Sequence, residues 1–194
     1  MKIFIASDHG GFELKEFLKK GLEKGNQIED LGCGNEKSCD YPEFAEKVAN
    51  AVIESNGKAL GILCCGTGIG MCMTANKIRG VRAAVVWDEF TAKTAKEHNN
   101  ANILCLGGRS LDKGDALKLA GIFMRSKFEG ETKAGERHVR RLKQMDEVAG
   151  RQELPEVTVG ALIFNDKSQV FLMKSPKWDN LYSVPGGHVE LGET

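Results

Sequence analysis

The sequence predicts an α/β fold: a doubly wound, Rossmann-like sheet of five parallel strands with helices on both faces, followed by an incomplete β-rich fragment. Over residues 1–148, short apolar segments alternate with segments in which apolar residues recur at helical spacing. This alternation is typical of parallel strands joined by crossover helices. After residue 155 the helical spacing ends, and only short strand-like segments follow.

Five segments have the composition of buried strands. They are Lys2–Ser7, Gln27–Leu31, Ala59–Cys64, Val81–Trp87 and Asn102–Leu106. Helices are expected at Phe12–Lys24, Pro42–Ser55, Gly68–Ile78, Glu89–Glu97, Leu111–Ser126 and Glu136–Glu147. In the first helix, four apolar residues are expected to share the inward face, namely Leu14, Phe17, Leu18 and Leu22. Pro42 suits the first turn of the second helix, where a missing N–H leaves no helical bond unmade.

These patterns divide the chain into a domain over residues 1–148, a linker over 149–155 and an incomplete fragment over 156–194. The linker is predicted because the segment from Gly150 to Pro155 is polar and ends in proline. In the last part, strand-like stretches are expected at Glu156–Phe164, Gln169–Lys174 and Leu181–Val184. A fragment this short with only a few strands rarely forms a stable core by itself.

The composition argues against several classes of protein. Lys and Arg number 27 and Asp and Glu number 27, so the formal net charge is zero and no bulk field attracts nucleic acid or an anionic membrane. The sequence has no apolar run of membrane-spanning length, and Met1–Asp8 enters a strand pattern without a signal peptide. We therefore expect a cytoplasmic protein. The six cysteines form no C-x-x-C pair and the four histidines are scattered, so no metal site is expected.

The run from Cys64 to Gly70 is the most informative local feature. A strand ends in two thiols and meets a loop with glycine at every second position, Gly66, Gly68 and Gly70. Backbone N–H groups of such a loop can surround an anion, and a thiolate at its edge can act as a base or nucleophile. The loop does not match a dinucleotide-binding fingerprint, because Met71 occupies the position of the third glycine. A cysteine phosphatase loop fails because no arginine follows at the required spacing.

Other reactive groups also lie near predicted strand ends. Asp8-His9-Gly10-Gly11 follows the first strand, Gly107-Gly108-Arg109 ends the fifth, and Glu97-His98-Asn99-Asn100 ends the helix before it. We expect these groups to gather with Cys65 on one edge of the sheet, where ligands of doubly wound folds bind. Taken singly, an Asp-His pair is more often a capping feature, and a strand-end cysteine is more often part of the core.

A phosphate site is predicted on the last helix. Arg137 and Arg141 are four residues apart and share a helix face, and two guanidinium groups on one face suit a phosphate monoester. A solvated basic helix face explains the spacing equally well.

The first 148 residues resemble the family of ribose-5-phosphate isomerase B, which also holds the galactose-6-phosphate isomerase subunits. Six motifs carry the resemblance, in family order: Ser7-Asp8-His9-Gly10-Gly11, Asp40-Tyr41-Pro42, Cys65-Gly66-Thr67-Gly68-Ile69-Gly70, Ala75-Asn76-Lys77, Glu97-His98-Asn99-Asn100-Ala101-Asn102 and Gly135-Glu136-Arg137-His138. The resemblance implies an aldose–ketose isomerase that needs no metal or organic cofactor.

The resemblance also implies a role for each matching residue. Cys65 matches the base that moves a proton between C1 and C2 of the sugar phosphate, and the glutamate used by other branches of the family is absent from Ile69–Met73. Thr67 and the amides of the loop match the hole for the enediolate oxygen, the amides being those of Gly66, Gly68, Ile69 and Gly70. His98 matches the group that assists ring opening, with Asp8 near the ring oxygen.

The remaining matches concern substrate binding and assembly. The phosphate contacts match His9, Arg137 and Arg141, and further substrate contacts match Tyr41, Asn99 and Arg109. The family implies a homodimer or a tetramer with an active site shared between subunits, in which the partner donates His98, Asn99 and Arg109. Charge that builds on oxygen during proton abstraction is stabilised by fixed N–H donors, which agrees with the assignment of the loop.

The end of the chain resembles the opening of a Nudix hydrolase. Gly187 and Glu193 have the G-x5-E spacing of the Nudix box, and the stretch Trp178–Gly187 also matches. The helix that carries the metal-binding glutamates is not within the sequence, so we expect a truncated fragment without hydrolase activity.

The sequence therefore predicts an isomerase of ribose 5-phosphate and ribulose 5-phosphate that uses a cysteine base and a cis-enediolate. Three alternatives stay open at this point: an isomerase of allose or galactose 6-phosphate, a Nudix-type nucleotide pyrophosphohydrolase if a full-length C-terminal domain is the active part, and a non-catalytic sugar-phosphate-binding subunit.

Overall fold

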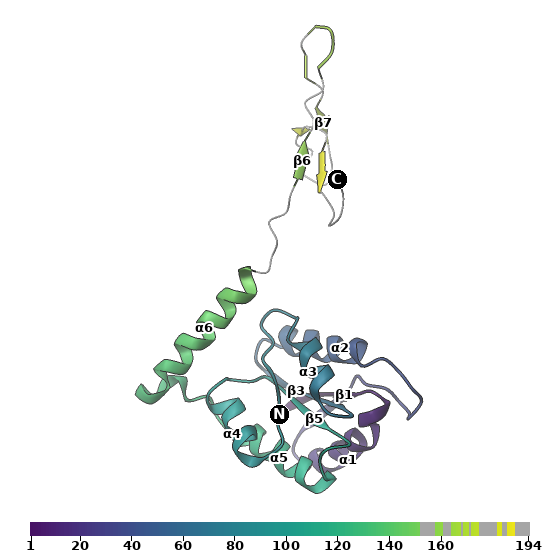
Figure 1. Cartoon of the computed structure of the whole chain (residues 1–194), viewed down its shortest axis with the longest axis vertical. Coiled ribbons are helices and arrows are strands. Elements are labelled where there is room, and N and C mark those ends of the chain that lie inside the picture. The colour runs from purple at the N-terminus through teal and green to yellow at the C-terminus, as the bar shows by residue number, and fades with distance from the viewer. Residues whose placement is uncertain are drawn as a thin grey trace. The chain divides into compact units, whose positions relative to one another are not determined.

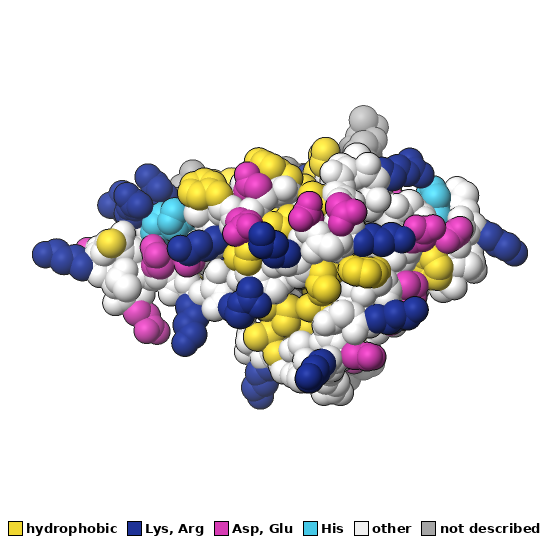
Figure 2. Space-filling view, turned by 90° about the horizontal axis from the view of Figure 1, so that it is seen from below, with side chains coloured by type: hydrophobic (Ala, Val, Ile, Leu, Met, Phe, Trp, Pro, Cys, Tyr) yellow, Lys and Arg dark blue, Asp and Glu magenta, His cyan; other side chains and the backbone are white. Residues whose placement is uncertain are grey.

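The computed structural model describes residues 1–151, 158–160, 164–167, 169–170, 172–174, 182–183 and 186–188. The chain divides into two compact units, Met1–Ala149 and Gly150–Thr194. No helix in these described ranges is long and apolar enough to cross a membrane. Basic and acidic side chains are interspersed on the face of the molecule in Figure 2, as the zero net charge leads one to expect.

The first unit is built on a parallel sheet of five strands, which confirms the predicted fold class (Figure 1). The strands are β1 (Lys2–Ser7), β2 (Gln27–Asp30), β3 (Ala59–Cys65), β4 (Ala83–Val85) and β5 (Ile103–Gly107), in the order β2-β1-β3-β5-β4. The chain leaves β1 toward β2 on one side and later returns to β3 on the other side. The carboxyl ends of β1 and β3 therefore flank a topological switch point, where ligands of doubly wound sheets bind.

Helices cover both faces of this sheet. They are α1 (Phe12–Leu22), α2 (Tyr41–Glu54), α3 (Ile69–Ala75), α4 (Glu89–Glu97) and α5 (Lys113–Arg125). A further helix, α6 (Glu136–Arg151), follows α5, and short 3-10 turns lie at His9–Gly11, Glu129–Glu131 and Lys133–Gly135. In Figure 1, α2 and α3 lie on one side of the strands, and α1, α4 and α5 lie on the other. Each side has its own apolar core.

Alternation along β3 assigns its side chains to the two cores. Ile62 and Cys64 belong to the core beneath α1, α4 and α5, whereas Leu63 and Cys65 belong to the core beneath α2 and α3. Cys64 has no exposed surface, and burial raises the pKa of its thiol well above its usual range. Strand alternation predicts from the sequence that Cys64 is a core residue on the opposite side from Cys65, and the two cores confirm this prediction.

Several predicted elements are shorter than expected, and two of them lose four residues each. Of the predicted strand Val81–Trp87, only Ala83–Val85 pairs with β5, and the predicted helix Gly68–Ile78 spans Ile69–Ala75. The side chain of Asn76 explains the early helix end. Its amide group donates to the carbonyl oxygen of Ala83 at 2.9 Å, and its carbonyl oxygen accepts from the amide of Ala83 at 2.8 Å. These two bonds fasten the end of α3 to the start of β4.

The inward face of α1 also differs from the expectation. Phe17 is 38% exposed, so it does not face the sheet with Leu14, Leu18 and Leu22. The place beside these leucines is taken by Lys15, whose side chain is buried.

In the second unit, the described residues include β6 (Thr158–Gly160) paired antiparallel with β9 (Gly186–His188), and β7 (Met173–Lys174) paired antiparallel with β8 (Tyr182–Ser183). Most of the predicted linker 149–155 lies outside the described residues. The same holds for much of the three predicted strand-like stretches and for Glu193 of the Nudix-like motif.

Gly11 provides a test of how closely α1 approaches β3. A Cβ atom at this position would lie 2.3 Å from both the carbonyl carbon and the carbonyl oxygen of Cys64, and backbone atoms cannot move aside as a flexible side chain can. We expect Gly11→Ala to lower the free energy of unfolding by about 2 kcal/mol or more, the scale of overpacking in a well-packed interior. Urea denaturation measures the change.

Gly34→Ala is the matched control, because no atom lies within 4 Å of a Cβ atom built at Gly34. This variant should stay within about 0.5 kcal/mol of the wild type. Equal stability of the two variants would contradict the close approach.

Candidate active site

The turn after β1 forms one wall of the candidate site. The amide of Asp8 donates to the carbonyl oxygen of Cys64 at 3.2 Å, which carries the β1–β3 pairing one residue past the strand. The buried Asp8 carboxylate accepts a hydrogen bond from the amide of Gly11 at 3.0 Å and so caps the 3-10 turn. The capping interpretation of Asp8 is therefore confirmed, while its contact with a sugar ring stays a prediction.

The loop after β3 places a thiol next to a backbone donor. The amide of Gly68 lies 3.1 Å from Cys65 Sγ, and Cys65 is 5% exposed. Gly68 has φ +78°, and a Cβ atom built there would lie 3.0 Å from the carbonyl carbon of Leu106. A left-handed conformation this close to another strand is compatible only with glycine without strain. Thr67 and Ile69, on either side, are exposed.

Tyr41 and Arg109 pack against the glycines at the two ends of this loop. A Cβ atom at Gly70 would lie 2.8 Å from Cζ of Tyr41, and one at Gly66 would lie 3.4 Å from Cδ of Arg109. The amide of Arg109 also donates to the carbonyl oxygen of Gly66 at 3.0 Å. Arg109 therefore lies beside the loop of its own chain, in contrast to the expectation that a partner subunit donates it.

His9 lies on the same edge and is oriented by a distant segment. Its Nδ1 atom is 3.3 Å from both the backbone nitrogen and the backbone oxygen of Cys39. A neutral ring can accept from that amide, and a protonated ring can donate to that carbonyl. In either state Cys39 occupies Nδ1, which leaves Nε2 as the nitrogen available to a ligand.

His98 and Asn99 lie on the opposite edge of the sheet, which corrects the expectation that all reactive groups share one edge. The helix α4 starts after the carboxyl end of β4 and returns the chain to the start of β5, so it ends at the amino edge. Contacts of the following residues agree. Arg82, just before β4, donates through Nε to the carbonyl oxygen of Asn100 at 3.0 Å and through its amide to Asn102 Oδ1 at 2.8 Å.

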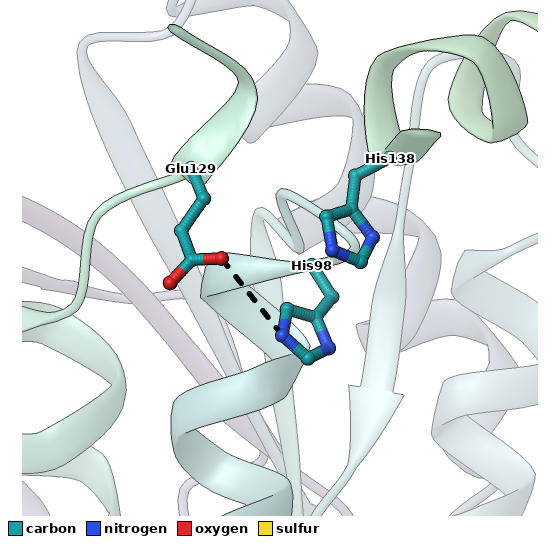
Figure 3. Close-up of side chains that lie close together, drawn as sticks. All are labelled: His98, Glu129 and His138. Atoms are coloured by element: carbon teal, nitrogen blue, oxygen red, sulfur yellow. Dashed lines mark ion pairs between the residues drawn. The ribbon is translucent and has the colours of Figure 1, made fainter. Parts of the chain in front are cut away.

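His98 belongs to a second cluster with residues of the C-terminal region of the first unit (Figure 3). Its ring stacks on that of His138, with 4.3 Å between ring centroids and 9° between ring planes. Glu129 Oε2 lies 4.0 Å from His98 Nε2. Arg137 donates through Nε to His138 Nε2 at 3.3 Å, so this predicted phosphate ligand joins the His98 cluster. Arg141, one turn further along α6, is exposed.

The His98 cluster also contains three groups that metals can bind. One ligand atom from each of His98, Glu129 and His138 lies within 4.8 Å of the other two. Imidazole lone pairs lie in the ring plane, so two nearly parallel stacked rings do not aim their lone pairs at one common centre. Arg137 adds a positive charge at His138. The observed arrangement is therefore not one that suits a divalent cation.

His138 is the group in this cluster whose ionisation is most clearly perturbed. Its pKa is lowered from the usual value, first by burial and then by the neighbouring His98, Arg137 and Arg141. Glu129 acts in the opposite direction but does not outweigh these effects. The neutral ring is therefore favoured at neutral pH, which is compatible with a ring that accepts a hydrogen bond from Arg137.

Sequence reasoning did not single out Cys39 or Glu129. Cys39 acts through its backbone, which has no sequence signature. Glu129 lies in a short 3-10 turn, and its approach to His98 depends on the tertiary fold. Neither contact follows from periodicity or motif spacing.

Comparison with known proteins identifies relatives of the first unit. The sequence model of the Ribose/Galactose Isomerase family matches residues 3–145. A probable ribose-5-phosphate isomerase B of Mycoplasma genitalium is 44% identical over 145 residues, which are 74% of this chain and 92% of the relative.

Solved structures agree. Ribose-5-phosphate isomerase B of Clostridium thermocellum matches with a TM-score of 0.73 and 39% identity, over 78% of this chain and 99% of that one. A crystal structure of ribose-5-phosphate isomerase B from Mycoplasma genitalium with bound ribulose-5-phosphate matches with a TM-score of 0.71 and 42% identity, over 79% of this chain and 97% of that one.

The lowered pKa of His138 predicts a loss of stability in acid. In the unfolded chain a histidine takes up a proton near pH 6.5, whereas the folded protein resists protonation until a lower pH. The contribution of His138 is therefore fully present above about pH 6.5 and is lost as the pH falls toward the folded-state pKa. Urea unfolding at pH 7.5 and pH 5.5 should show a smaller acid loss for His138→Gln than for the wild type. An identical loss in both proteins would contradict the prediction.

Proposed function

Because this chain belongs to the ribose/galactose isomerase family, we propose that it interconverts ribose 5-phosphate and ribulose 5-phosphate. The first unit of the chain aligns with nearly the whole length of relatives that are named ribose-5-phosphate isomerase B. The relative from Mycoplasma genitalium binds ribulose-5-phosphate in its crystal structure. The proposed substrate is therefore a sugar phosphate, and the proposed chemistry is the transfer of a proton between neighbouring carbons.

Cys65 is the proposed base, and the observation that carries this assignment is the 3.1 Å contact between its sulfur and the amide of Gly68. This contact holds the sulfur against the loop where the substrate is proposed to lie. In the open-chain aldose, the thiolate removes the proton from C2, and the electron pair moves to the carbonyl oxygen to give a cis-enediolate. The proton of the C2 hydroxyl passes to the oxygen on C1, the electron pair left on the C2 oxygen forms the new carbonyl, and the thiol returns its proton to C1. The ketose forms with no net change in the enzyme.

The enediolate oxygen is proposed to lie against the loop that follows Cys65. Its donors would be the Thr67 hydroxyl and the backbone amides of Gly66, Ile69 and Gly70. The amide of Gly68 is directed at the sulfur, and that of Ile69 donates to Thr67 Oγ1 at 3.4 Å before an enediolate binds. Preorganised donors of this kind lower the barrier because they meet charge that develops only in the transition state. Tyr41 and Arg109 would contact the sugar, because they lie against the two ends of this loop.

The groups on the opposite edge are proposed to act in a neighbouring subunit. His98, as the ring-opening group, and Asn99 lie at the amino edge, whereas Asp8 and Cys65 lie at the carboxyl edge of the same chain. In a homodimer the two sets of groups can form one site, if the partner presents its His98 cluster to the loop that follows Cys65. Because Arg137 contacts His138 and His138 stacks on His98, the phosphate ligands Arg137 and Arg141 would arrive from the partner together with His98. His9 would complete the phosphate site from the first chain.

Exposed apolar side chains on α6 support the proposal that this helix contacts a partner subunit. Met145 and Val148 are each about half exposed, and their spacing of three residues puts them on one side of the helix. Apolar side chains left in water on one side of a helix are typical of an interface. We propose that a second copy of the chain covers this side.

Replacement of Cys65 tests the base. Without added metal, wild-type protein should isomerise ribose 5-phosphate, and Cys65→Ser should lower kcat by about a hundredfold or more, the scale of general-base catalysis. Cys64→Ala is the matched control, because Cys64 is the neighbouring thiol and faces the other core. Full activity in Cys65→Ser would refute the proposed base. Allose 6-phosphate and galactose 6-phosphate, assayed in parallel, test whether the five-carbon sugar is preferred.

Subunit mixing tests the shared site. Cys65→Ser and His98→Asn should each be nearly inactive alone, since each homodimer has two damaged sites. After subunit exchange at equal amounts, half of the dimers are mixed, and each mixed dimer holds one intact site, so about a quarter of the wild-type activity should return. Native mass spectrometry reports the mixed dimers. Mixed dimers without recovered activity would show that Cys65 and His98 act within one chain.

A further inference from the structure

We propose that Lys15 is a positioning residue for the candidate phosphate ligand His9, acting through the segment that joins β2 to α2. The proposal rests on the proposed function for the role given to His9, but the structural link between the two residues stands on its own contacts. Lys15 lies on α1 and has no place in the family motifs on which the function was based.

Lys15 is a charged residue inside the protein. It is 1% exposed, and its ammonium group contacts both carboxylate oxygens of Asp30, at 2.8 and 3.0 Å, and the carbonyl oxygen of Cys33 at 2.7 Å. Glu16 Oε1 also lies 3.3 Å from the ammonium nitrogen, so the three N–H donors of the group all have acceptors within reach. A buried charge is tolerated only when it is paired and hydrogen-bonded in this way, so the position of Lys15 requires Asp30 and Cys33 to stay where they are.

Asp30 is held as a carboxylate by the same contacts. Burial raises its pKa, but hydrogen bonds from Lys15, Lys19 and the amide of Gly32 outweigh this effect and lower the pKa below its usual range. The charged pair therefore persists at neutral pH. It fixes the end of β2, where the chain turns toward the active-site edge.

The segment after β2 lies flat against β1. The amide of Leu31 donates to the carbonyl oxygen of Ile5 at 2.8 Å, and the amide of Cys33 donates to that of Ser7 at 3.2 Å. Between them, a Cβ atom at Gly32 would lie 2.4 Å from the backbone nitrogen of Ser7, so this position has no room for a side chain. Lys15 holds the segment from one side at the Cys33 carbonyl, while β1 holds it from the other.

The same segment reaches His9 through its second cysteine. The Cys33 thiol lies 3.8 Å from the Ser7 hydroxyl and donates to the carbonyl oxygen of Asn35 at 3.2 Å. The Asn35 side chain accepts from the amide of Lys37 at 2.9 Å, and two residues later the Cys39 backbone lies 3.3 Å from His9 Nδ1. Lys15 thus holds the start of a short, hydrogen-bonded segment whose other end contacts the ring of His9.

The comparison of Lys15→Met with Lys19→Met tests the proposal. Lys19 contacts the same Asp30 carboxylate at 2.6 Å, but it is partly exposed and makes no contact with Cys33. Loss of the Cys33 contact should displace the His9 ring and raise KM for ribose 5-phosphate about tenfold, the scale of one hydrogen bond to a charged group, with kcat changed less than about threefold. Lys19→Met should keep the wild-type KM. In both variants, nitrogen NMR of the imidazoles reports the state of His9, with its signals assigned by His9→Gln.

A changed His9 nitrogen signal in Lys15→Met, with the wild-type signal in Lys19→Met, supports the proposal. An unchanged signal and KM in folded Lys15→Met would overturn it. If Lys15→Met does not fold, Lys15→Met with Asp30→Asn removes both charges of the pair and is measured in its place. The NMR signal does not depend on substrate, so a normal KM in His9→Gln would count against the phosphate role of His9 and leave the positioning role to be decided by NMR.

Discussion

The pairing of β1 with β3 is the constraint on which the candidate site depends. In this parallel ladder Ser7 lies opposite Cys64, so two segments far apart in the sequence end at the same level of the sheet. The turn that carries Asp8 and His9 and the loop that carries Cys65 therefore meet at the switch point. Gly11 and Gly68 allow the two segments to approach this closely, because a side chain at either position would collide with neighbouring backbone.

Much of this arrangement could be predicted from the sequence. The alternation of apolar strands with amphipathic helices predicts the parallel sheet, and the period of two along β3 assigns Cys64 and Cys65 to different faces. Both features depend on local patterns. The fold was predictable because every crossover in such a sheet obeys the same rule of direction and hand.

That rule of direction also shows why one expectation about the site was wrong. His98 was placed with Cys65 because both lie near strand ends, but His98 precedes its strand and Cys65 follows one. All strands of a parallel sheet point the same way, so the order of helix, loop and strand decides at which end of the strands a residue lies. The sequence contained the information needed to place His98 correctly.

Other contacts could not be predicted in this way. The stacking of His98 on His138 and the approach of Glu129 depend on how the chain returns after α5, for which no periodicity exists. Lys15 is an intermediate case. Its spacing of three and seven residues from Leu18 and Leu22 puts it on the buried face of α1, but a lysine on such a face is unexpected unless its partner Asp30 is already known.

The separation of the two clusters onto opposite edges of one sheet has a consequence for how activity would depend on protein concentration. On the proposed arrangement, a lone folded chain holds every catalytic group but no complete site. Catalysis would then be a property of the associated species, and dilution would abolish it without unfolding anything. A ligand that contacts both clusters at once would bind only the associated form and would therefore draw the chains together by mass action.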